Sequence, residues 1–363
     1  MKNKSEETKL PDGRYKALVY VILVIAISFA LFILSKPWRQ GRLIGPEEIL
    51  NNATGLAGSS SSHNTTTPSR TEKKRTDEED AHNNDPFVAK RANNESQKLE
   101  KRKIKMKQLK KELEKRIKKF PGKVGLVLYK TGTGERIEIN AGEVFESASL
   151  IKIPIMLEVY NQIRDGKITE DDVVVLKNSH KVGGSGVLKN RKAGSKWKVS
   201  KLIELMIIDS DNTATDMLIE LAGMEEIEKS TKEHGMKDTT LRRKIYAFEE
   251  IDRGKDNYTT PQDMFFILKE LYEEEKIDGK VRAKMLIILK DQKRKDMIPK
   301  YLPNGVECAH KTGGLSGILH DCGIIYPVKG APYILILMSK NVTNENLAKQ
   351  VFANISKKVF DFM

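Results

Sequence analysis

The sequence predicts an α+β fold, in which one antiparallel sheet is built from both ends of a domain and a helical region fills the middle. Three observations lead to this class. Strand patterns occur at 123–140 and return at 305–339, helical patterns run between them, and 347–362 form an amphipathic helix with apolar residues four apart. Strands at both ends with helices between them require distant parts of the chain to pair in one sheet.

The first 94 residues carry a different signal. Residues 17–35 are nineteen uncharged and mostly apolar positions, which at helical rise span a bilayer core of about 30 Å. More basic residues precede this stretch than follow it, which favours a cytoplasmic N-terminus at 1–16. Residues 36–94 are rich in Asn, Ser, Thr and charged residues and predict a flexible linker. We therefore expect a single-pass cell-membrane protein with an extracytoplasmic domain at 95–363.

Much of the formal net charge of +14 lies in one basic stretch. Between Ser96 and Phe120 there are twelve Lys or Arg and three Glu, an excess of nine positive charges. Apolar residues recur in this stretch at helical spacing, at Leu99, Met106, Leu109, Leu113, Ile117 and Phe120. We expect the first helix of the folded domain here, with a basic face that could also contact anionic lipid or a cell-wall polymer.

The remaining elements follow in order. Strands at 123–130 and 135–140 are joined by Thr131-Gly132-Thr133-Gly134, a glycine-rich hairpin signal. Helical patterns occupy about 149–289, with loops near 180–195 and 242–260. Three further strands are expected at 305–312, 319–326 and 332–339.

The apolar helix that follows the first strand pair begins with Ser149-Leu150-Ile151-Lys152. Residues three apart on a helix share a face, so the Lys152 amine should reach the Ser149 hydroxyl directly. A serine hydroxyl is too weakly acidic to attack an acyl carbon unless a nearby base takes its proton. An amine with a pKa lowered by burial or by other cations is such a base.

Two later stretches complete the pattern. Ser210-Asp211-Asn212 joins two predicted helices, and taken alone it resembles a helix cap. His310-Lys311-Thr312-Gly313-Gly314 ends a strand, and taken alone it is a common turn. The three motifs in this order, at separations of about sixty and one hundred residues, form a far more specific signal than any one of them.

From about Leu99 to the C-terminus the sequence resembles the class A β-lactamases and, more widely, the penicillin-recognising serine enzymes that include D,D-peptidases. The likeness includes the glycine-rich hairpin, the stretch 183–189 and Thr259-Thr260-Pro261 before a helix. It implies a five-stranded antiparallel sheet flanked by N- and C-terminal helices, beside an all-helical subdomain.

The resemblance also implies roles for seven residues, namely Ser149, Lys152, Ser210, Asn212, Lys311, Thr312 and Gly314. Ser149 would be the nucleophile, Lys152 its base or proton relay, and Ser210 the proton donor to the leaving nitrogen. Asn212 would hold a substrate amide, and Lys311 with Thr312 would bind the substrate carboxylate. The N–H groups of Ser149 and Gly314 would form the oxyanion hole. The implied substrate is a β-lactam or a D-Ala-D-Ala peptide.

The sequence departs from the family pattern in two places. Counting back from Pro261, the loop glutamate that activates water in class A β-lactamases would fall near Lys244, so no carboxylate stands there. Glu249 and Glu250 follow, and solvated loop carboxylates are at least as plausible an interpretation of them as a replacement base. Leu319 stands where many relatives have an arginine for the substrate carboxylate.

We therefore expect a membrane-anchored serine hydrolase resembling class A β-lactamases. Two alternatives stay open: a peptidoglycan D,D-peptidase, and a non-hydrolysing penicilloyl- or wall-binding module. No cofactor is implied, and we expect neither a metal site nor nucleic-acid binding. Cys308 and Cys322 should lie close across a hairpin, either as a disulfide or as two buried free thiols, and His310 should pack beside Lys311.

Overall fold

The centre of the domain is a five-stranded antiparallel sheet, seen in a computed structural model that describes residues 86–273 and 276–363. Its strands lie in the order β2-β1-β9-β8-β7. Their bounds are Lys123–Lys130 (β1), Arg136–Ile139 (β2), Glu307–Leu315 (β7), Ile318–Tyr326 (β8) and Tyr333–Lys340 (β9). Strand β1 pairs with β9 along its whole length, from Lys123 opposite Lys340 to Lys130 opposite Tyr333. The predicted pairing of distant parts of the chain is confirmed.

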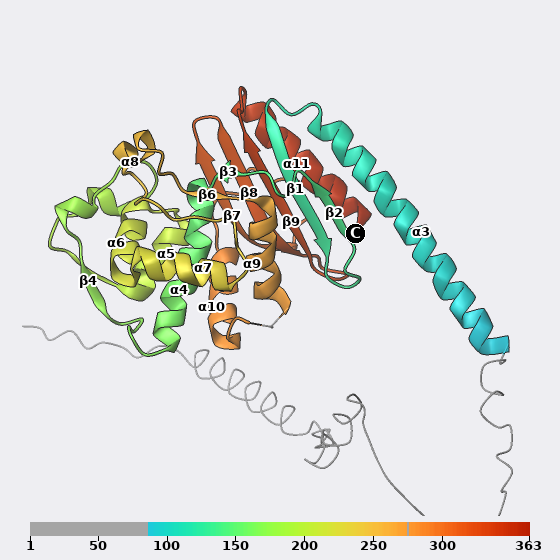
Figure 1. Cartoon of the computed structure of the whole chain (residues 1–363), viewed down its shortest axis with the longest axis horizontal. Helices are drawn as coiled ribbons and strands as arrows, with labels where there is room; N and C mark the ends of the chain where they lie inside the picture. Colours follow the sequence, from blue (N-terminus) through green and yellow to red (C-terminus); the bar gives the residue numbers. More distant parts are fainter. Residues whose placement is uncertain (1–85, 274–275) are drawn as a thin grey trace, which may run out of the picture. The chain divides into compact units, whose positions relative to one another are not determined.

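Two helices cover one face of this sheet, α3 (Pro86–Ile117) and α11 (Glu345–Phe362), which lie side by side in Figure 1. Because strand side chains alternate between faces, Leu126 and Leu128 of β1 pack toward these helices while Val127 packs on the other side. Leu113 of α3 and Phe352 of α11 are fully buried in this layer.

The other face carries the helical part of the domain. Its longer helices are α4 (Lys152–Arg164), α5 (Val199–Ile208), α6 (Asn212–Ala222), α7 (Met224–Glu233), α9 (Pro261–Glu273) and α10 (Gly279–Lys290). Shorter helical segments are η2 (Ala148–Ile151), η3 (Asn178–His180), η4 (Leu188–Asn190) and α8 (Phe248–Asp252). Two small antiparallel pairs complete it, β3 (Phe145–Glu146) with β6 (Tyr258–Thr259) and β4 (Val173–Val175) with β5 (Lys196–Lys198).

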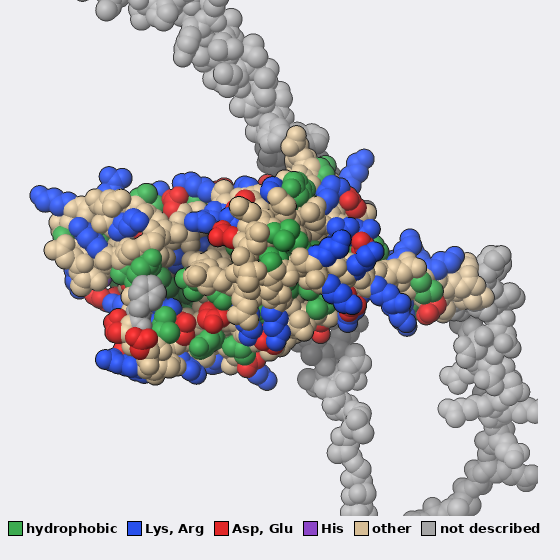
Figure 2. Space-filling model, turned by 90° about the horizontal axis from the view of Figure 1, so that it is seen from above, with side chains coloured by type: hydrophobic (Ala, Val, Ile, Leu, Met, Phe, Trp, Pro, Cys, Tyr) green, Lys and Arg blue, Asp and Glu red, His purple; other side chains and the backbone are tan. Residues whose placement is uncertain are grey.

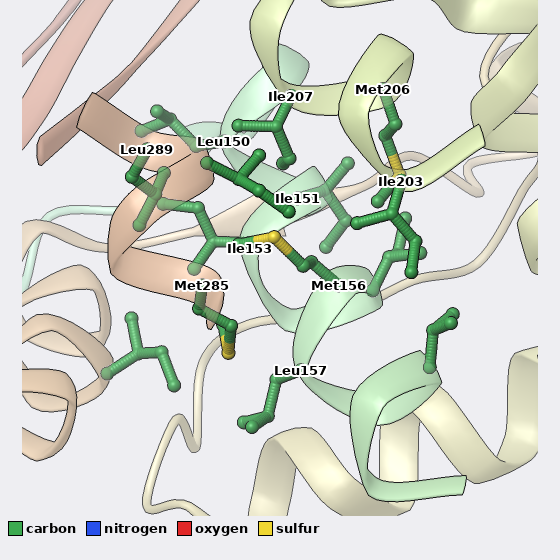
Figure 3. Close-up of a cluster of buried hydrophobic side chains, with 14 of the residues drawn as sticks. Leu150, Ile151, Ile153, Met156, Leu157, Ile203, Met206, Ile207, Met285 and Leu289 are labelled. Atoms are coloured by element: carbon green, nitrogen blue, oxygen red, sulfur yellow. The ribbon is translucent and has the colours of Figure 1, made fainter. Parts of the chain in front are cut away.

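Helix α4 lies at the centre of the helical part. Figure 3 shows Ile153, Met156 and Leu157 of α4 among side chains from α5 and α10, which include Ile203 and Met285. All residues from Lys152 to Tyr160 are buried, so the helix has no solvent-facing side along these positions. Close packing on every side holds the start of α4 in place, and with it Ser149 and Lys152.

The membrane span expected at 17–35 lies outside the described residues. So does most of the linker expected at 36–94, of which only residues 86–94 are described. Among residues 86–273 and 276–363, no helix is both long enough and apolar enough to cross a bilayer. Helix α3 begins at Pro86, so residues 86–94, the last part of the expected linker, are helical. Proline is favoured as the first residue of a helix.

The two cysteines are buried free thiols. The β7–β8 register places Cys308 opposite Ile325 and Cys322 opposite Lys311. Cys308 packs under α3 and α11, whereas Cys322 packs on the helical side. The thiols therefore lie on opposite faces of the sheet, where a disulfide cannot form.

Candidate active site

The structure brings all seven predicted site residues to one place, where three parts of the chain meet. Segment η2 and the start of α4 supply the serine and lysine, the α5–α6 junction supplies the second serine and the asparagine, and β7 supplies the rest. In chain order the residues are Ser149, Lys152, Ser210, Asn212, Lys311, Thr312 and Gly314.

The Ser210 hydroxyl is the junction of the cluster. It donates a hydrogen bond to Ser149 Oγ at 2.9 Å and accepts from Lys152 Nζ at 3.2 Å and from Lys311 Nζ at 3.0 Å. A hydroxyl has one donor and two acceptor positions, so this arrangement uses all three. Ser210 holds a left-handed backbone conformation, with φ of 52°, which costs free energy for any residue except glycine.

Lys152 is fully buried and donates to Ser210 O at 2.8 Å and to Asn212 Oδ1 at 2.8 Å, besides Ser210 Oγ. Burial lowers the pKa of Lys152 well below its ordinary value, and the positive charge of Lys311 lowers it further. The sequence predicted a direct contact between this amine and Ser149. In the structure Ser210 connects the two, because the backbone of the α5–α6 junction projects its side chain between them.

Lys311 is the second buried amine of the site. Its Nζ donates to Thr312 O at 2.8 Å as well as to Ser210 Oγ. Burial, followed by the positive charge of Arg294, lowers the pKa of Lys311 to about 7. Near neutral pH this lysine therefore exchanges between an ammonium, which attracts a carboxylate, and a neutral amine.

A cavity of about 310 Å³ opens in front of Ser149 and Ser210. Thr312 and Gly314 line one side, and the exposed Arg294, from the loop between α10 and β7, lines another. At its far end Lys349 of α11 is paired with two carboxylates, Asp296 at 2.9 Å and Glu345 at 2.8 Å. Among the described residues that line this cavity, Arg294 is therefore the cation without a carboxylate partner, and the buried Lys311 lies directly behind the lining residues Ser210 and Thr312.

Arg294 was missed by the sequence analysis. Leu319, where relatives carry an arginine, is buried and lines the same cavity, so the guanidinium here comes from a different segment. Arg294 stands between Lys293 and Lys295 in the chain, and nothing in that basic run shows which side chain enters the site.

A second, smaller cavity of about 120 Å³ lies on the other side of Ser149. It is lined by Asn212 and Gly184 and by the loop residues Arg243, Ile245 and Tyr246. Among the described residues, no Asp or Glu side chain lines this space.

Lys244, where the loop glutamate was expected, does not line this cavity, whereas the adjacent Arg243 and Ile245 do. The Ile245 amide donates to Asp216 Oδ1 at 2.9 Å, which turns the Lys244 side chain outward to Glu220 at 3.0 Å. Glu250 pairs with Arg253 and Lys255. The adjacent Glu249 is exposed and lies outside the cavity lining, so the solvated interpretation fits both glutamates.

Asp211 is fully buried at the α5–α6 junction, where it holds the backbone of the site in place. Its Oδ1 caps α6 by accepting from Ala214 N at 2.9 Å, as the helix-cap interpretation predicted. Its Oδ2 also accepts from the N–H groups of Val187 and Leu188, at 2.6 and 2.9 Å. The backbone of Gly186 comes so close that an added Cβ would lie 2.2 Å from Asp211 Cγ. Asp211 thereby connects the stretch 183–189 to the α5–α6 junction.

Comparison with known proteins agrees with this arrangement. The sequence model of the Beta-lactamase enzyme family matches residues 108–363. The chain belongs to this family. It is a serine hydrolase of the β-lactamase type, and the expected β-lactamase/transpeptidase-like α+β fold is confirmed. Relatives include a β-lactamase of Bacillus licheniformis, 25% identical over 252 residues, which cover 66% of this chain and 79% of that protein.

Solved structures of the family superimpose on the same part of the chain. A β-lactamase from Sphaerobacter thermophilus is 30% identical with a TM-score of 0.62, covering 66% of this chain and 91% of that one. PBP-A is 24% identical with a TM-score of 0.65, covering 70% of this chain and 95% of that one, and shares the fold. A mutant of PBP-A, 25% identical, was solved as an acyl-enzyme complex with penicillin G.

Proposed function

We propose that this family member forms an acyl ester with β-lactams at Ser149 and hydrolyses that ester slowly. The observation that carries the proposal is the Ser210 hydroxyl, which connects Ser149 to both buried lysines. A neutral Lys152 has a lone pair, so it can accept a hydrogen bond from Ser210 in place of donating one, and the Ser149 hydroxyl can then donate to Ser210. In that arrangement Lys152 takes the Ser210 proton as Ser210 takes that of Ser149. The Ser149 oxygen then bonds to the lactam carbonyl carbon, the C–N bond breaks, and the proton ends on the released nitrogen by way of Ser210.

Charge and hydrogen bonding in the larger cavity support the substrate class. Thr312 and Arg294 line this cavity, and the Lys311 ammonium lies next to it, bonded to Thr312 O. A hydroxyl and two cations so placed suit the carboxylate that β-lactams carry. The N–H groups of Ser149 and Gly314 are proposed to bind the developing oxyanion, and Asn212 the substrate's side-chain amide.

Slow hydrolysis follows from the smaller cavity. A water molecule attacking the acyl ester there would have no carboxylate to take its proton, because the loop residues that line this cavity are Arg243, Ile245 and Tyr246. General bases contribute about 10²- to 10⁴-fold to such steps. The same lack of a lining carboxylate favours a second candidate, a D,D-peptidase that acts on a D-Ala-D-Ala peptide. It also agrees with the third alternative, a module that forms the acyl ester and does not hydrolyse it.

One experiment separates these functions. The full chain in detergent is incubated with a fluorescent penicillin, while turnover of a chromogenic cephalosporin is followed in parallel. Stable label with little turnover supports the proposal, and release of D-Ala from a pentapeptide identifies the peptidase. Fast turnover would contradict slow hydrolysis, and labelling of Ser149→Ala at the wild-type rate would contradict the nucleophile.

We further propose that the domain lies outside the cytoplasm, anchored by the apolar segment at 17–35, and that α3 adds attraction to an anionic surface. Figure 2 shows Lys and Arg side chains along the part of α3 that extends from the domain. Exposed Leu99 and Ile104 lie among these cations, which suits a lipid surface better than a soluble polymer. Charge reversal of Lys101 and Lys105 should weaken retention on anionic vesicles. Unchanged retention would contradict the lipid partner, and loss of binding to wall polymer alone would favour the polymer.

A further inference from the structure

We propose that His320 of β8 is a positioning residue for the nucleophile, which holds the backbone ahead of Ser149 so that the Ser149 N–H points into the oxyanion site. The inference rests on the proposed acylation at Ser149. It starts from a contact between distant parts of the chain: His320 Nε2 lies 2.8 Å from Glu146 O, at the end of β3 and three residues before Ser149.

The hydrogen bonds of His320 define its tautomer. The Ser339 N–H points at Nδ1, at 3.1 Å, and can donate only to an unprotonated nitrogen. The Leu319 carbonyl beside Nδ1 accepts from Ser339 Oγ at 2.7 Å, so it has another donor. The proton therefore lies on Nε2 and is donated to Glu146 O. Burial lowers the pKa of His320 to about 4, which keeps the ring neutral under ordinary conditions.

The backbone that His320 holds is strained. Ala148 has a φ of 44°, in the left-handed region that alanine rarely adopts. Such a conformation persists only where the surroundings determine it. Three bonds do so here: His320 to Glu146 O, Ser147 N to Asn257 O at 2.8 Å, and Leu150 N to Ser147 O at 3.0 Å. The bond from Leu150 lies within the turn itself and Asn257 precedes β6, so of the three bonds the one from His320 connects the turn to the main sheet.

Packing around Gly313 of β7 connects His320 to the proposed oxyanion site. Gly313 of β7 lies opposite His320 in the strand register. A Cβ added to Gly313 would lie 3.2 Å from His320 Cδ2, 3.2 Å from Ala148 Cβ and 3.3 Å from Ser149 N. The ring, the strained residue and the nucleophile's amide thus meet next to Gly314, which supplies the second proposed oxyanion donor. A shift of the turn would move one donor relative to the other.

The test compares three variants of the full chain with the wild type. His320→Leu removes the donor, and His320→Gln restores an N–H near the Nε2 position. His310→Leu is the matched control, because His310 is equally buried in the neighbouring strand but pairs with Asp321, toward the α3 and α11 layer. Acylation by fluorescent penicillin is measured as a maximal rate and a half-saturating concentration, together with the unfolding temperature.

We expect His320→Leu to lower the maximal acylation rate about 100-fold, the effect of a misplacement of about 1 Å, with the half-saturating concentration unchanged. His320→Gln should recover most of that rate. His310→Leu should lower the unfolding temperature and leave acylation at the wild-type rate. Acylation of His320→Leu that is no slower than that of His310→Leu would overturn the inference.

If the wild-type protein takes no penicillin label, the proposed acylation is contradicted, and the kinetic comparison of the variants cannot be made. The crystal structure of His320→Leu then decides the positioning role by itself. Ala148 moving out of the left-handed region supports it, and an unchanged turn overturns it.

Discussion

Ser210 uses its full hydrogen-bonding capacity to connect the two buried lysines with Ser149. The positive charge of Lys311 lowers the proton affinity of Lys152, so the pair is most useful when Lys152 is neutral and Lys311 charged. Lys152, which is close to the nucleophile, suits the neutral role, and Lys311, which is bonded to Thr312 at the edge of the larger cavity, suits the charged one. Because the two lysines act in different protonation states, substrate affinity should depend on pH.

Substrate affinity should fall as pH rises through the pKa of Lys311, at about 7. Below that value the lysine is an ammonium and attracts the carboxylate, and above it the attraction is lost. In Lys311→Arg the guanidinium stays charged, so the half-saturating penicillin concentration should become nearly independent of pH. Acylation kinetics measured on both sides of pH 7 check this. A wild-type affinity that does not weaken on the alkaline side would show that Lys311 stays charged.

The missing loop base gives a second prediction for single residues. Ile245→Glu places a carboxylate in the small cavity beside Ser149 and Asn212, and should speed release of bound penicilloyl by at least about 100-fold. Lys244→Glu is the control, because that side chain points to Glu220 and should leave the release rate unchanged. Release is followed on the isolated acyl-enzyme. Equal acceleration in both variants would mean that the loop does not hold the position described.

The site residues differ in how far the sequence could predict them. Ser149, Lys152, Ser210 and Lys311 belong to short motifs in which spacing along the chain carries the chemistry. Ile245, Arg294 and His320 enter the site because of the path of a loop or the register of a strand pair. A count along the loop pointed to Lys244, but the adjacent Arg243 and Ile245 line the cavity instead, because the bond from the Ile245 amide to Asp216 sets the turn.

At the scale of elements, α3 has two different halves. Leu113 is fully buried between α11 and the sheet, whereas Leu99 is about half exposed. Leu113→Ala should lower the free energy of unfolding by about 2–5 kcal/mol, as for other buried leucines, while Leu99→Ala should change it by less than about 0.5 kcal/mol. Denaturant titration of both variants measures the difference. A large effect at Leu99 would mean that the first half of α3 also packs on the domain.

The main strands and helices could be predicted because each is long enough to show its period. The pairs β3–β6 and β4–β5, two and three residues long, are too short for alternation to be visible and were not predicted. The start of α3 at Pro86 was not predicted either, because the apolar residues at helical spacing that indicated the helix begin only at Leu99. Short elements of this kind are fixed by tertiary contacts, as the bond from His320 to Glu146 at the end of β3 illustrates.

For the whole molecule, the distribution of charge matters more than its total. The net charge of +14 includes an excess of nine in the stretch from Ser96 to Phe120, which begins on the exposed half of α3 and ends at the domain. An apolar segment at 17–35 and a polar stretch come first in the chain, followed by the basic helix α3 with which the domain begins. This order is the one expected of a domain held near an anionic surface from one side.

The proposed location predicts which penicillins reach Ser149 in intact cells. A charged fluorescent penicillin that does not cross the cytoplasmic membrane should label the full chain without lysis, because the domain lies outside. Deletion of residues 17–35 removes the segment that would carry the domain across, so that variant should be labelled only after the cells are opened. Ser149→Ala serves as the unlabelled control in both preparations. If the full chain also requires lysis, the domain lies on the cytoplasmic side and the apolar segment has another role.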